Sequence, residues 1–257
     1  AVAADPTVVL VASSPENLTA QGLDALGIEH RRVSLREFRD FSTLDADLLI
    51  WGFDESREAL APRQEEMAAF LRAGGVFLGF RSSGEDAWLP VPAAHDKAYA
   101  FGEILCPEHA IFTQPHALSE KELAQVHGGS VYRAFRGLGP GWIPLCSTGA
   151  EQAWDKTSPG GDGPCYGLIE LPLGEGRLIL CQMIPEYAWF RDAEGDRETP
   201  GAKLFETLVR YALANAPSRA ADRPPRVAPE SFRGDLADVV VTPGRRSGVP
   251  LTEPAWK

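Results

Sequence analysis

Runs of consecutive apolar residues constrain the fold of this chain more than any other feature of its sequence. Three of them stand in its first third: Thr7–Ser13 (TVVLVAS), Ala46–Phe53 (ADLLIWGF) and Val76–Phe80 (VFLGF). Each predicts a strand that is buried on both faces, and such strands are typical of parallel sheets covered by helices on either side. The more polar run His30–Leu35 (HRRVSL) predicts a short strand at the edge of the same sheet.

Two amphipathic helices are predicted between these strands. The first begins after Asn17, a capping residue, and ends at Gly27, whereas the second begins at Pro62 and ends at Gly74 and Gly75. Their apolar residues recur at helical spacing: Leu18, Leu23 and Leu26 in the first helix, and Met67, Phe70 and Leu71 in the second. This alternation predicts an α/β fold with a flavodoxin-like, doubly wound and mostly parallel sheet.

An antiparallel extension of the sheet is predicted from the second half of the chain. Tyr166–Gln182 has the pattern of a hairpin, two strands joined by a Gly-Glu-Gly turn. Further strands are expected at Ala98–Leu105 and Ile143–Thr148, and a helix near Ser119–Val126. Gly201–Asn215 has the periodicity of an amphipathic helix that closes the domain.

The composition changes after this helix, which sets the expected domain boundary. Residues 1–216 predict a single domain. Residues 217–257 are rich in Pro and Arg and predict a tail that wraps the surface, in which Ala237–Pro243 (ADVVVTP) adds a strand.

Charge and cysteine content exclude several kinds of partner. The chain of 257 residues has a formal net charge of −11, which argues against nucleic acid because phosphates require a basic surface. No apolar run approaches the ~18 residues of a membrane span. None of the four cysteines forms a C-x-x-C pair, so a zinc site is not expected. The opening AVAAD fits a cleaved signal peptide and an expression remnant equally well, so the location stays open between exported and cytoplasmic. A disulfide between Cys146 and Cys165 would require export, and it therefore stays open as well.

The chain resembles the class I glutamine amidotransferase-like fold, and most nearly its ThuA-like and carbohydrate-enzyme-associated branch. The segments that carry the resemblance are LLIWGF, LRAGGVFLGFRSSGED and GEGRLILCQMIPEY, and it extends from about Thr7 to Asn215. Active members of that family carry a Gly-x-Cys-x-Gly nucleophile elbow after the fourth strand and a His-Pro-Glu on a late strand. In this chain Arg81 stands in the place of the cysteine and Ile184 in the place of the histidine, whereas Glu186 remains.

The resemblance therefore implies a triad that has lost its chemistry. Hydrolysis of glutamine through a thioester needs a thiolate and a base, and neither arginine nor isoleucine supplies one. Ser82 and Ser83 stand on the same turn, but a serine nucleophile would also need a nearby histidine, so we interpret them as small residues that permit a sharp turn. The catalytic residues stay unknown, and no cofactor is expected.

A ligand site is predicted at the edge of the sheet where the parallel strands end. Trp51, Trp88 and Trp189 would lie near this edge beside carboxylates, which suits a sugar, although large aromatic residues also close the core under loops. The candidate ligand-binding residues are Trp51, Asp54, Arg81, Ser82, Ser83, Glu85, Trp88, Gln182, Glu186, Tyr187 and Trp189. No metal site is expected, and His109 is the best single candidate for one.

Two functions follow as expectations, with a third left open. The first is a glutaminase-inactive domain that binds a small polar ligand such as a carbohydrate, or that serves as an accessory or assembly module. The second is a ThuA-like enzyme that acts on a sugar with acids such as Glu85 and Glu186, and the third is a structural domain that forms a homo-oligomer. We also expect Arg81 to have the unusual backbone of an elbow and to contact Glu186 directly or through water.

Overall fold

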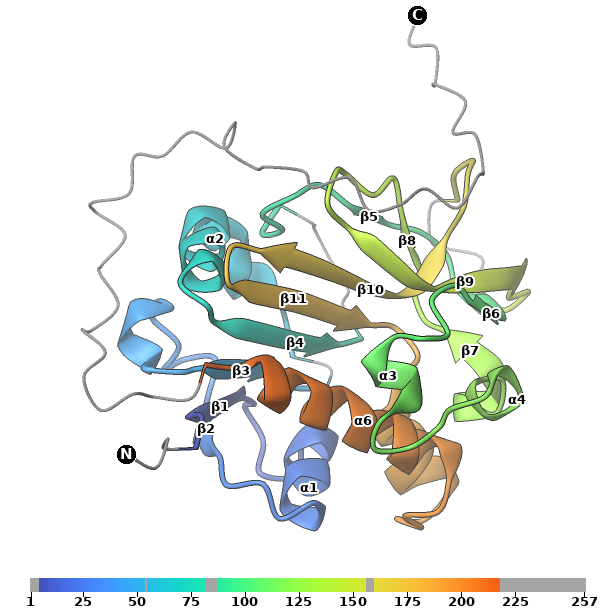
Figure 1. Cartoon of the computed structure of the whole chain (residues 1–257), viewed down its shortest axis with the longest axis horizontal. Coiled ribbons are helices and arrows are strands. Elements are labelled where there is room, and N and C mark those ends of the chain that lie inside the picture. The colour runs from blue at the N-terminus through green and yellow to red at the C-terminus, as the bar shows by residue number, and fades with distance from the viewer. Residues whose placement is uncertain (1–4, 54, 82–86, 156–159, 218–257) are drawn as a thin grey trace, which may run out of the picture.

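An extended mixed sheet crosses the protein and has helices on both of its faces (Figure 1). The computed structural model describes residues 5–53, 55–81, 87–155 and 160–217. Along the sheet the strands are ordered β2-β1-β3-β4-β11-β10-β9-β6-β7. Their bounds are β1 (Val8–Val11), β2 (Arg31–Val33), β3 (Leu48–Trp51), β4 (Val76–Phe80), β6 (Tyr99–Ile104), β7 (Ser130–Val131), β9 (Ile143–Glu151), β10 (Tyr166–Leu173) and β11 (Gly176–Cys181).

Five neighbouring strands are parallel, as the sequence predicted. β1 pairs in parallel with β2 and β3, β3 pairs with β4, and β4 pairs with β11. The order β2-β1-β3-β4-β11 is that of a doubly wound, flavodoxin-like sheet, and β2 lies at its edge. The predicted fold class is therefore confirmed.

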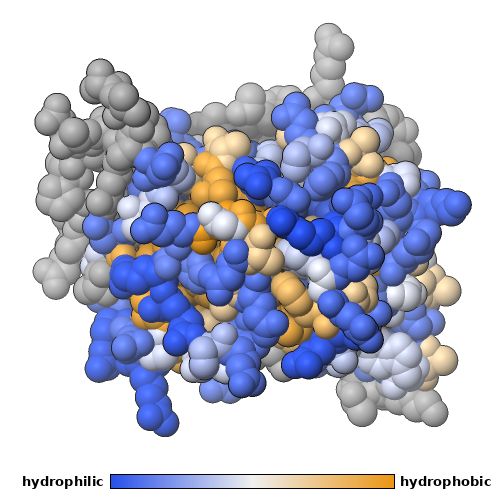
Figure 2. Space-filling view, turned by 90° about the horizontal axis from the view of Figure 1, so that it is seen from below, coloured by the Kyte–Doolittle hydropathy of each residue, from blue (hydrophilic) through white to orange (hydrophobic). Residues whose placement is uncertain are grey.

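The apolar strands have two buried faces, and each face has its own core. Val8 and Leu10 of β1 face one core, whereas Val9 and Val11 face the other, because successive side chains of a strand point to opposite sides. Helices α1 (Leu18–Ala25) and α6 (Pro200–Asn215) cover the first face, and α2 (Gln64–Arg72) covers the second. Seen from below, hydrophobic residues surface only in patches among hydrophilic ones (Figure 2).

Local signals in the sequence set the ends of the helices. The Asn17 side chain accepts a hydrogen bond from the Thr19 backbone N–H and caps α1, and Gly27 after the helix has a φ of 67°. The helix that Pro62 predicted begins two residues later, after a 3₁₀ turn over Glu58–Arg63. The expected helix near Ser119 is shorter than predicted: α4 (Glu120–Leu123) has a Ser119 capping box.

The second half of the chain forms the predicted antiparallel extension. β10 and β11 pair antiparallel across a two-residue connection, and Gly174 at that turn has a φ of 61°. β9 pairs with β10, and β6 with β9, so the sheet continues beyond its parallel half. The remaining strands and α-helices of the described residues are β5 (Ala94–His95), β8 (Phe135–Arg136), α3 (Ala110–Thr113) and α5 (Pro185–Tyr187), and further short helical turns span Ser42–Leu44, Val126–Gly129 and Ala188–Asp192.

The structure also bears on the cysteines, on membrane-spanning helices and on the C-terminal tail. All four cysteines are free, so Cys146 and Cys165 do not form a disulfide. None of the helices in the described part of the chain combines the length and the apolar character needed to cross a membrane. The tail predicted from residue 217 lies outside the described residues from residue 218 onward.

Gly176 allows the hairpin to pack closely against α2, and its replacement should destabilise the fold. A Cβ atom at this position would overlap the carbonyl oxygens of Gly75 and Leu71, which are backbone atoms that cannot move aside cheaply. We expect Gly176→Ala to lower the free energy of unfolding by about 1–3 kcal/mol in urea denaturation. The neighbouring Glu175→Ala, at an exposed turn position, is the control and should change it by less than about 0.5 kcal/mol. Equal stabilities of the two variants would contradict this packing.

Candidate functional site

A residue with a left-handed backbone stands shortly after the end of each of the parallel strands β4 and β11. Arg81 follows β4 with a φ of 43°, and Ile184 follows β11 with a φ of 43° and a ψ of 57°. The Arg81 N–H donates to the Cys181 carbonyl at 2.9 Å, so the two strand ends lie side by side. Such backbones cost about 1–3 kcal/mol for residues other than glycine and gather at functional sites. The elbow backbone that the sequence predicted for Arg81 is present.

The Arg81 guanidinium lies between two aromatic rings. Its Cζ atom is 4.5 Å from the centre of the Tyr132 ring and 5.2 Å from that of Phe53, distances at which a cation is attracted to the face of a ring. The predicted direct contact with Glu186 is not found, because within the described residues the Glu186 carboxylate bonds Thr19 and not Arg81. A water-bridged contact stays a prediction.

Glu186 is buried beneath α1 rather than directed to the edge of the sheet. Its Oε1 accepts from the Thr19 hydroxyl at 3.1 Å, and that hydroxyl accepts the Phe53 N–H at 2.8 Å. Its Oε2 has no hydrogen-bond partner among the described residues. Burial raises the pKa of Glu186 to about 8, against the lowering effects of its own backbone N–H, of Thr19, and of the Arg57 and Arg81 charges. The carboxyl is therefore mostly protonated at neutral pH.

Arg57, which the sequence analysis did not single out, holds the end of β4. The residue is 3% exposed, and its guanidinium donates to the carbonyls of Phe80 at 2.9 Å and Arg81 at 3.1 Å. It also lies 5.8 Å from the centre of the Trp88 ring. A guanidinium is suited to this position because its planar fork reaches two acceptors at once. Only its sequence position, in the loop after β3, could have suggested this role.

The three tryptophans proposed as ligand contacts belong to the core. Trp51 and Trp88 are 0% exposed and Trp189 is 1% exposed. Trp51 contacts Phe38 edge-on and stacks on Phe77, on the face of the sheet opposite to Trp189. Their rings therefore lie in the two cores rather than over the edge of the sheet, and contact between them and a ligand stays a prediction.

The other candidate residues fall into three groups. Gln182 is buried and donates from Nε2 to the Arg133 carbonyl at 2.7 Å, which fixes the end of β11. Tyr187 is half-exposed. The remaining candidates, Asp54, Ser82, Ser83 and Glu85, lie outside the described residues.

His109, the metal candidate, is committed to a polar network. Its Nε2 lies 3.0 Å from Glu170, and its Nδ1 accepts from the Ile111 N–H at the start of α3. Glu170 also bonds Arg177 and Tyr211 at 2.7 and 2.8 Å. Among the described residues, no group of three His, Cys, Asp or Glu side chains could hold a metal ion.

A continuous row of rings crosses the edge of the sheet and includes Arg81. Tyr132 stacks on Trp154 with 5.4 Å between ring centres, Phe53 lies 6.0 Å from Tyr187, and His127 lies 4.9 Å from Tyr187. None of these side chains is buried, and Trp154 is 52% exposed. We call this set the aromatic–arginine row; its members are Trp154, Tyr132, Arg81, Phe53, Tyr187 and His127.

Sequence reasoning found only part of the aromatic–arginine row. Arg81 and Tyr187 were among the predicted residues, because both follow a parallel strand. Phe53 follows β3 in the same way and was overlooked in favour of Trp51. Tyr132 and Trp154 come from loops of the antiparallel extension, whose position beside the parallel strand ends no local pattern reveals.

Solved structures similar to this chain include the proteins that the sequence resemblance suggested. They include a glutamine amidotransferase from Thermotoga maritima (9% identity, TM-score 0.47, covering 81% of this chain and 98% of that one). They also include a proposed GMP synthase component from Thermoplasma acidophilum (13% identity, TM-score 0.46, 82% and 95%). A third is a β-galactosidase from Rahnella sp. R3 (15% identity, TM-score 0.43, 83% and 32%), of which this chain spans about a third.

All three similarities are distant, with identities of 15% or less and TM-scores of 0.47 or less. TM-scores below 0.5 at such identities carry no argument about activity, ligands or site residues. No family model matches the chain, and no curated protein matches its sequence. The functional argument therefore rests on the residues of this chain.

The buried Glu186 carboxyl should make stability depend on pH. Because its pKa is raised to about 8 in the folded protein, the folded state holds a proton that the unfolded state releases above its ordinary pKa near 4.5. The contribution of Glu186 to the free energy of unfolding is thus greatest below pH 4.5 and falls as the pH rises to about 8. We expect Glu186→Gln, which cannot ionise, to gain about 1.4 kcal/mol per pH unit relative to the parent within this window.

Urea denaturation at pH 5, 6.5 and 8 measures this difference. The control is Glu175→Gln, which changes an exposed carboxyl and should follow the parent at every pH. A difference between Glu186→Gln and the parent that stays constant with pH would show that Glu186 titrates normally.

Proposed function

We propose that this protein is a glutaminase-inactive, amidotransferase-like domain that binds a small polar ligand, such as a carbohydrate, on the aromatic–arginine row. The absence of glutaminase chemistry is argued from Arg81 and Ile184. Neither side chain can act as the nucleophile or the base of amide hydrolysis. Cys181, the cysteine nearest to Ile184 along the chain, is fully buried, and burial raises its pKa to about 12. It therefore supplies no thiolate at neutral pH.

The aromatic–arginine row is the observation that carries the binding proposal. A sugar ring presents apolar C–H faces, which pack on aromatic rings, and hydroxyl groups, which accept hydrogen bonds. Tyr132, Phe53 and the exposed Trp154 provide ring faces at the ends of the parallel strands, where ligands of such sheets bind. The Arg81 guanidinium lies between two of these rings and provides donors in a fixed plane.

The position of Glu186 argues against the alternative that the protein is an enzyme acting on a sugar. A general acid must come within hydrogen-bond reach of its substrate. Glu186 is 0% exposed and is engaged by Thr19 beneath α1, so it does not face the surface where a sugar would lie. Its raised pKa is explained by burial and needs no catalytic role.

Assembly is the second candidate function, and one observation favours it. Trp, Tyr and Arg are the residues that contribute most to protein–protein interfaces, and the aromatic–arginine row contains all three, with Trp154 52% exposed. A second copy of the chain seated on this row would raise the mass in solution. Light scattering after size exclusion distinguishes the two functions. Assembly through the aromatic–arginine row predicts the mass of an oligomer, whereas ligand binding on the row predicts the mass of a monomer.

Sugar binding is tested by titration of tryptophan fluorescence with a panel of neutral and acidic monosaccharides. We expect at least one to bind, and Tyr132→Ala to weaken it about tenfold because the stacked face is lost, the equivalent of ~1.4 kcal/mol. Leu105→Ala truncates another exposed apolar side chain, outside the aromatic–arginine row, and should leave the affinity unchanged. A saccharide that binds Tyr132→Ala as tightly as the parent would place the site elsewhere, and failure of the whole panel would remove the carbohydrate proposal.

Glutamine hydrolysis is the second measurement. Incubation of the purified protein with glutamine should release no ammonia above the level of a heat-denatured sample, since the elbow carries Arg81 in place of a thiol. Ammonia release that iodoacetamide abolishes would show that another cysteine acts as the nucleophile and that the chain is an active glutaminase.

A further inference from the structure

An aspartate–histidine pair stands at one end of the aromatic–arginine row. His127 Nδ1 lies 2.7 Å from Asp192 Oδ2, and the imidazole meets the Tyr187 ring edge-on, with 4.9 Å between ring centres. Because a carboxylate only accepts, the proton of the neutral imidazole is on Nδ1 and Nε2 carries the lone pair. Among the described residues Nε2 has no hydrogen-bond partner, and the side chain is 32% exposed. The pair therefore presents an accessible acceptor beside the row.

Both members of this pair come from irregular backbone. His127 has a φ of 45° and a ψ of 50° within the 3₁₀ turn Val126–Gly129. Asp192 is the last residue of a π-helical turn, Ala188–Asp192, which directly follows α5. A left-handed backbone costs free energy in a histidine, and π turns are rare and frequent at functional sites. The meeting of two such segments in one side-chain contact indicates a functional arrangement rather than an incidental surface pair.

The segment that carries His127 is fixed on both sides of it. Val126 is 1% exposed and belongs to the same core as α6. The Tyr132 N–H donates to the Gln182 carbonyl at 2.7 Å, next to the end of β11. One short segment thus supplies both Tyr132 and His127 to the row. Groups that are held in place before binding lose little conformational entropy when a ligand arrives.

The charge of the pair favours a neutral ligand over an acidic one. The Asp192 carboxylate lies within hydrogen-bond distance of the imidazole, and the whole chain has a formal net charge of −11. A lone pair beside a carboxylate attracts the proton of a hydroxyl group, whereas it repels a second carboxylate. Saccharides carry such hydroxyl groups next to C–H faces that pack on aromatic rings.

Building on the proposed function, we propose that His127 accepts a hydrogen bond from one hydroxyl group of a neutral saccharide whose ring packs on Tyr187 and Phe53. Asp192 is a positioning residue, because it accepts the Nδ1–H and so keeps the lone pair on Nε2. The ligand class of the aromatic–arginine row is thereby narrowed to uncharged saccharides, and His127 selects for a hydroxyl group at one position of the sugar.

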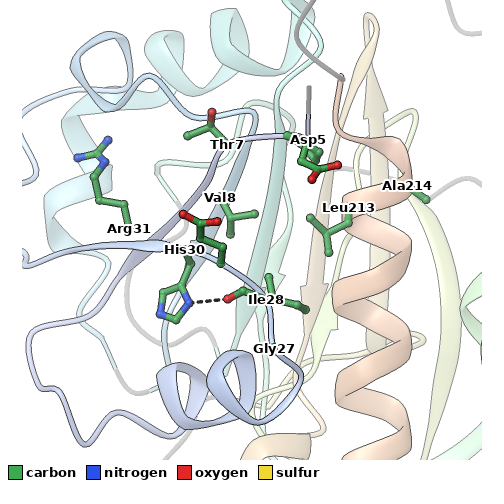
Figure 3. Close-up of a pocket in the computed structure, with 11 residues that line it drawn as sticks. Asp5, Thr7, Val8, Gly27, Ile28, His30, Arg31, Leu213 and Ala214 are labelled. Carbon is green, nitrogen blue, oxygen red and sulfur yellow. Dashed lines mark hydrogen bonds between the residues drawn. The ribbon is translucent and has the colours of Figure 1, made fainter. Parts of the chain in front are cut away.

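A cavity of about 850 Å³ at the opposite end of the sheet is the competing place for a saccharide (Figure 3). It is bounded by the start of β1, the loop between α1 and β2, and the last turn of α6. A histidine lines this cavity as well: the His30 Nδ1 bonds the Ile28 carbonyl at 3.0 Å (Figure 3). His30 therefore provides a matched control for His127.

Isothermal titration calorimetry of the full chain with D-glucose, D-galactose, D-mannose, maltose and lactose tests the role of His127. We expect His127→Asn to weaken the tightest-binding of these probes about fivefold, because one hydrogen bond is lost. Asparagine tolerates a left-handed backbone, so this variant should keep the turn. His30→Asn should bind the probe as the parent does. Urea midpoints equal to that of the parent verify that both variants are folded.

Deoxy analogues of the same probe separate a lost hydrogen bond from a structural effect. The analogue without the hydroxyl group that His127 contacts should bind the parent about fivefold more weakly than the full sugar. In His127→Asn the two should bind equally, and in Asp192→Ala their difference should shrink because the ring is no longer positioned. If every analogue loses as much affinity in His127→Asn as in the parent, His127 bonds no hydroxyl group and the proposal is wrong.

The remaining outcomes distinguish the role of His127 from the proposed function. A saccharide that Tyr132→Ala weakens and His127→Asn does not would overturn the role of His127 and leave the site on the row. A loss of affinity in His30→Asn alone would assign the sugar to the cavity of Figure 3. Tighter binding of D-glucuronate than of D-glucose would overturn the neutral ligand class. Failure of every saccharide would remove the carbohydrate proposal together with the role of His127.

Discussion

The parallel pairing of β4 with β11 is the constraint on which the rest of the structure depends. Five residue pairs, from Val76 with Arg177 to Phe80 with Cys181, join a strand of the first half of the chain to one of the second half. This pairing couples the parallel sheet to the antiparallel extension, because β11 also forms the hairpin with β10. It fixes the ends of both strands at the same edge, where Arg81 directly follows β4 and Ile184 stands three residues after the last residue of β11.

On the proposed function, the edge of the sheet where β4 and β11 end keeps the backbone of a reactive site without its reactive groups. Arg81 and Ile184 retain left-handed conformations that cost free energy, and Arg57 secures the first of them through two carbonyls. Burial keeps Glu186 a mostly neutral acid, and its carboxyl accepts a hydrogen bond from Thr19 rather than pairing with a base. On the same proposal, the half-exposed rings beside Arg81 form the surface that is available to a ligand.

Sequence patterns predicted the elements whose signals are local. The apolar runs of β1, β3 and β4, the cap at Asn17 and the turn at Gly174 depend on neighbouring residues, and each was placed correctly. The orientation of Trp51 and Trp189 could not be predicted, because a ring at the end of a strand can turn into either core or toward solvent. The partner of Glu186 was missed for a related reason: Thr19 lies on α1, 167 residues away, and only the packing of α1 against α5 brings them together.

The central claim is that β4 and β11 end in an elbow and a late-strand position from which catalytic groups are missing. Arg81→Cys, with and without Ile184→His, tests it through the pH dependence of thiol alkylation. The parent provides the background, which is slow because burial raises the pKa of all four of its thiols, those of Cys106, Cys146, Cys165 and Cys181. If Arg81 and Ile184 occupy the places of a nucleophile and its base, addition of Ile184→His lowers the apparent pKa of the introduced thiol and speeds its alkylation below pH 7. Superimposable alkylation profiles with and without Ile184→His would contradict the account.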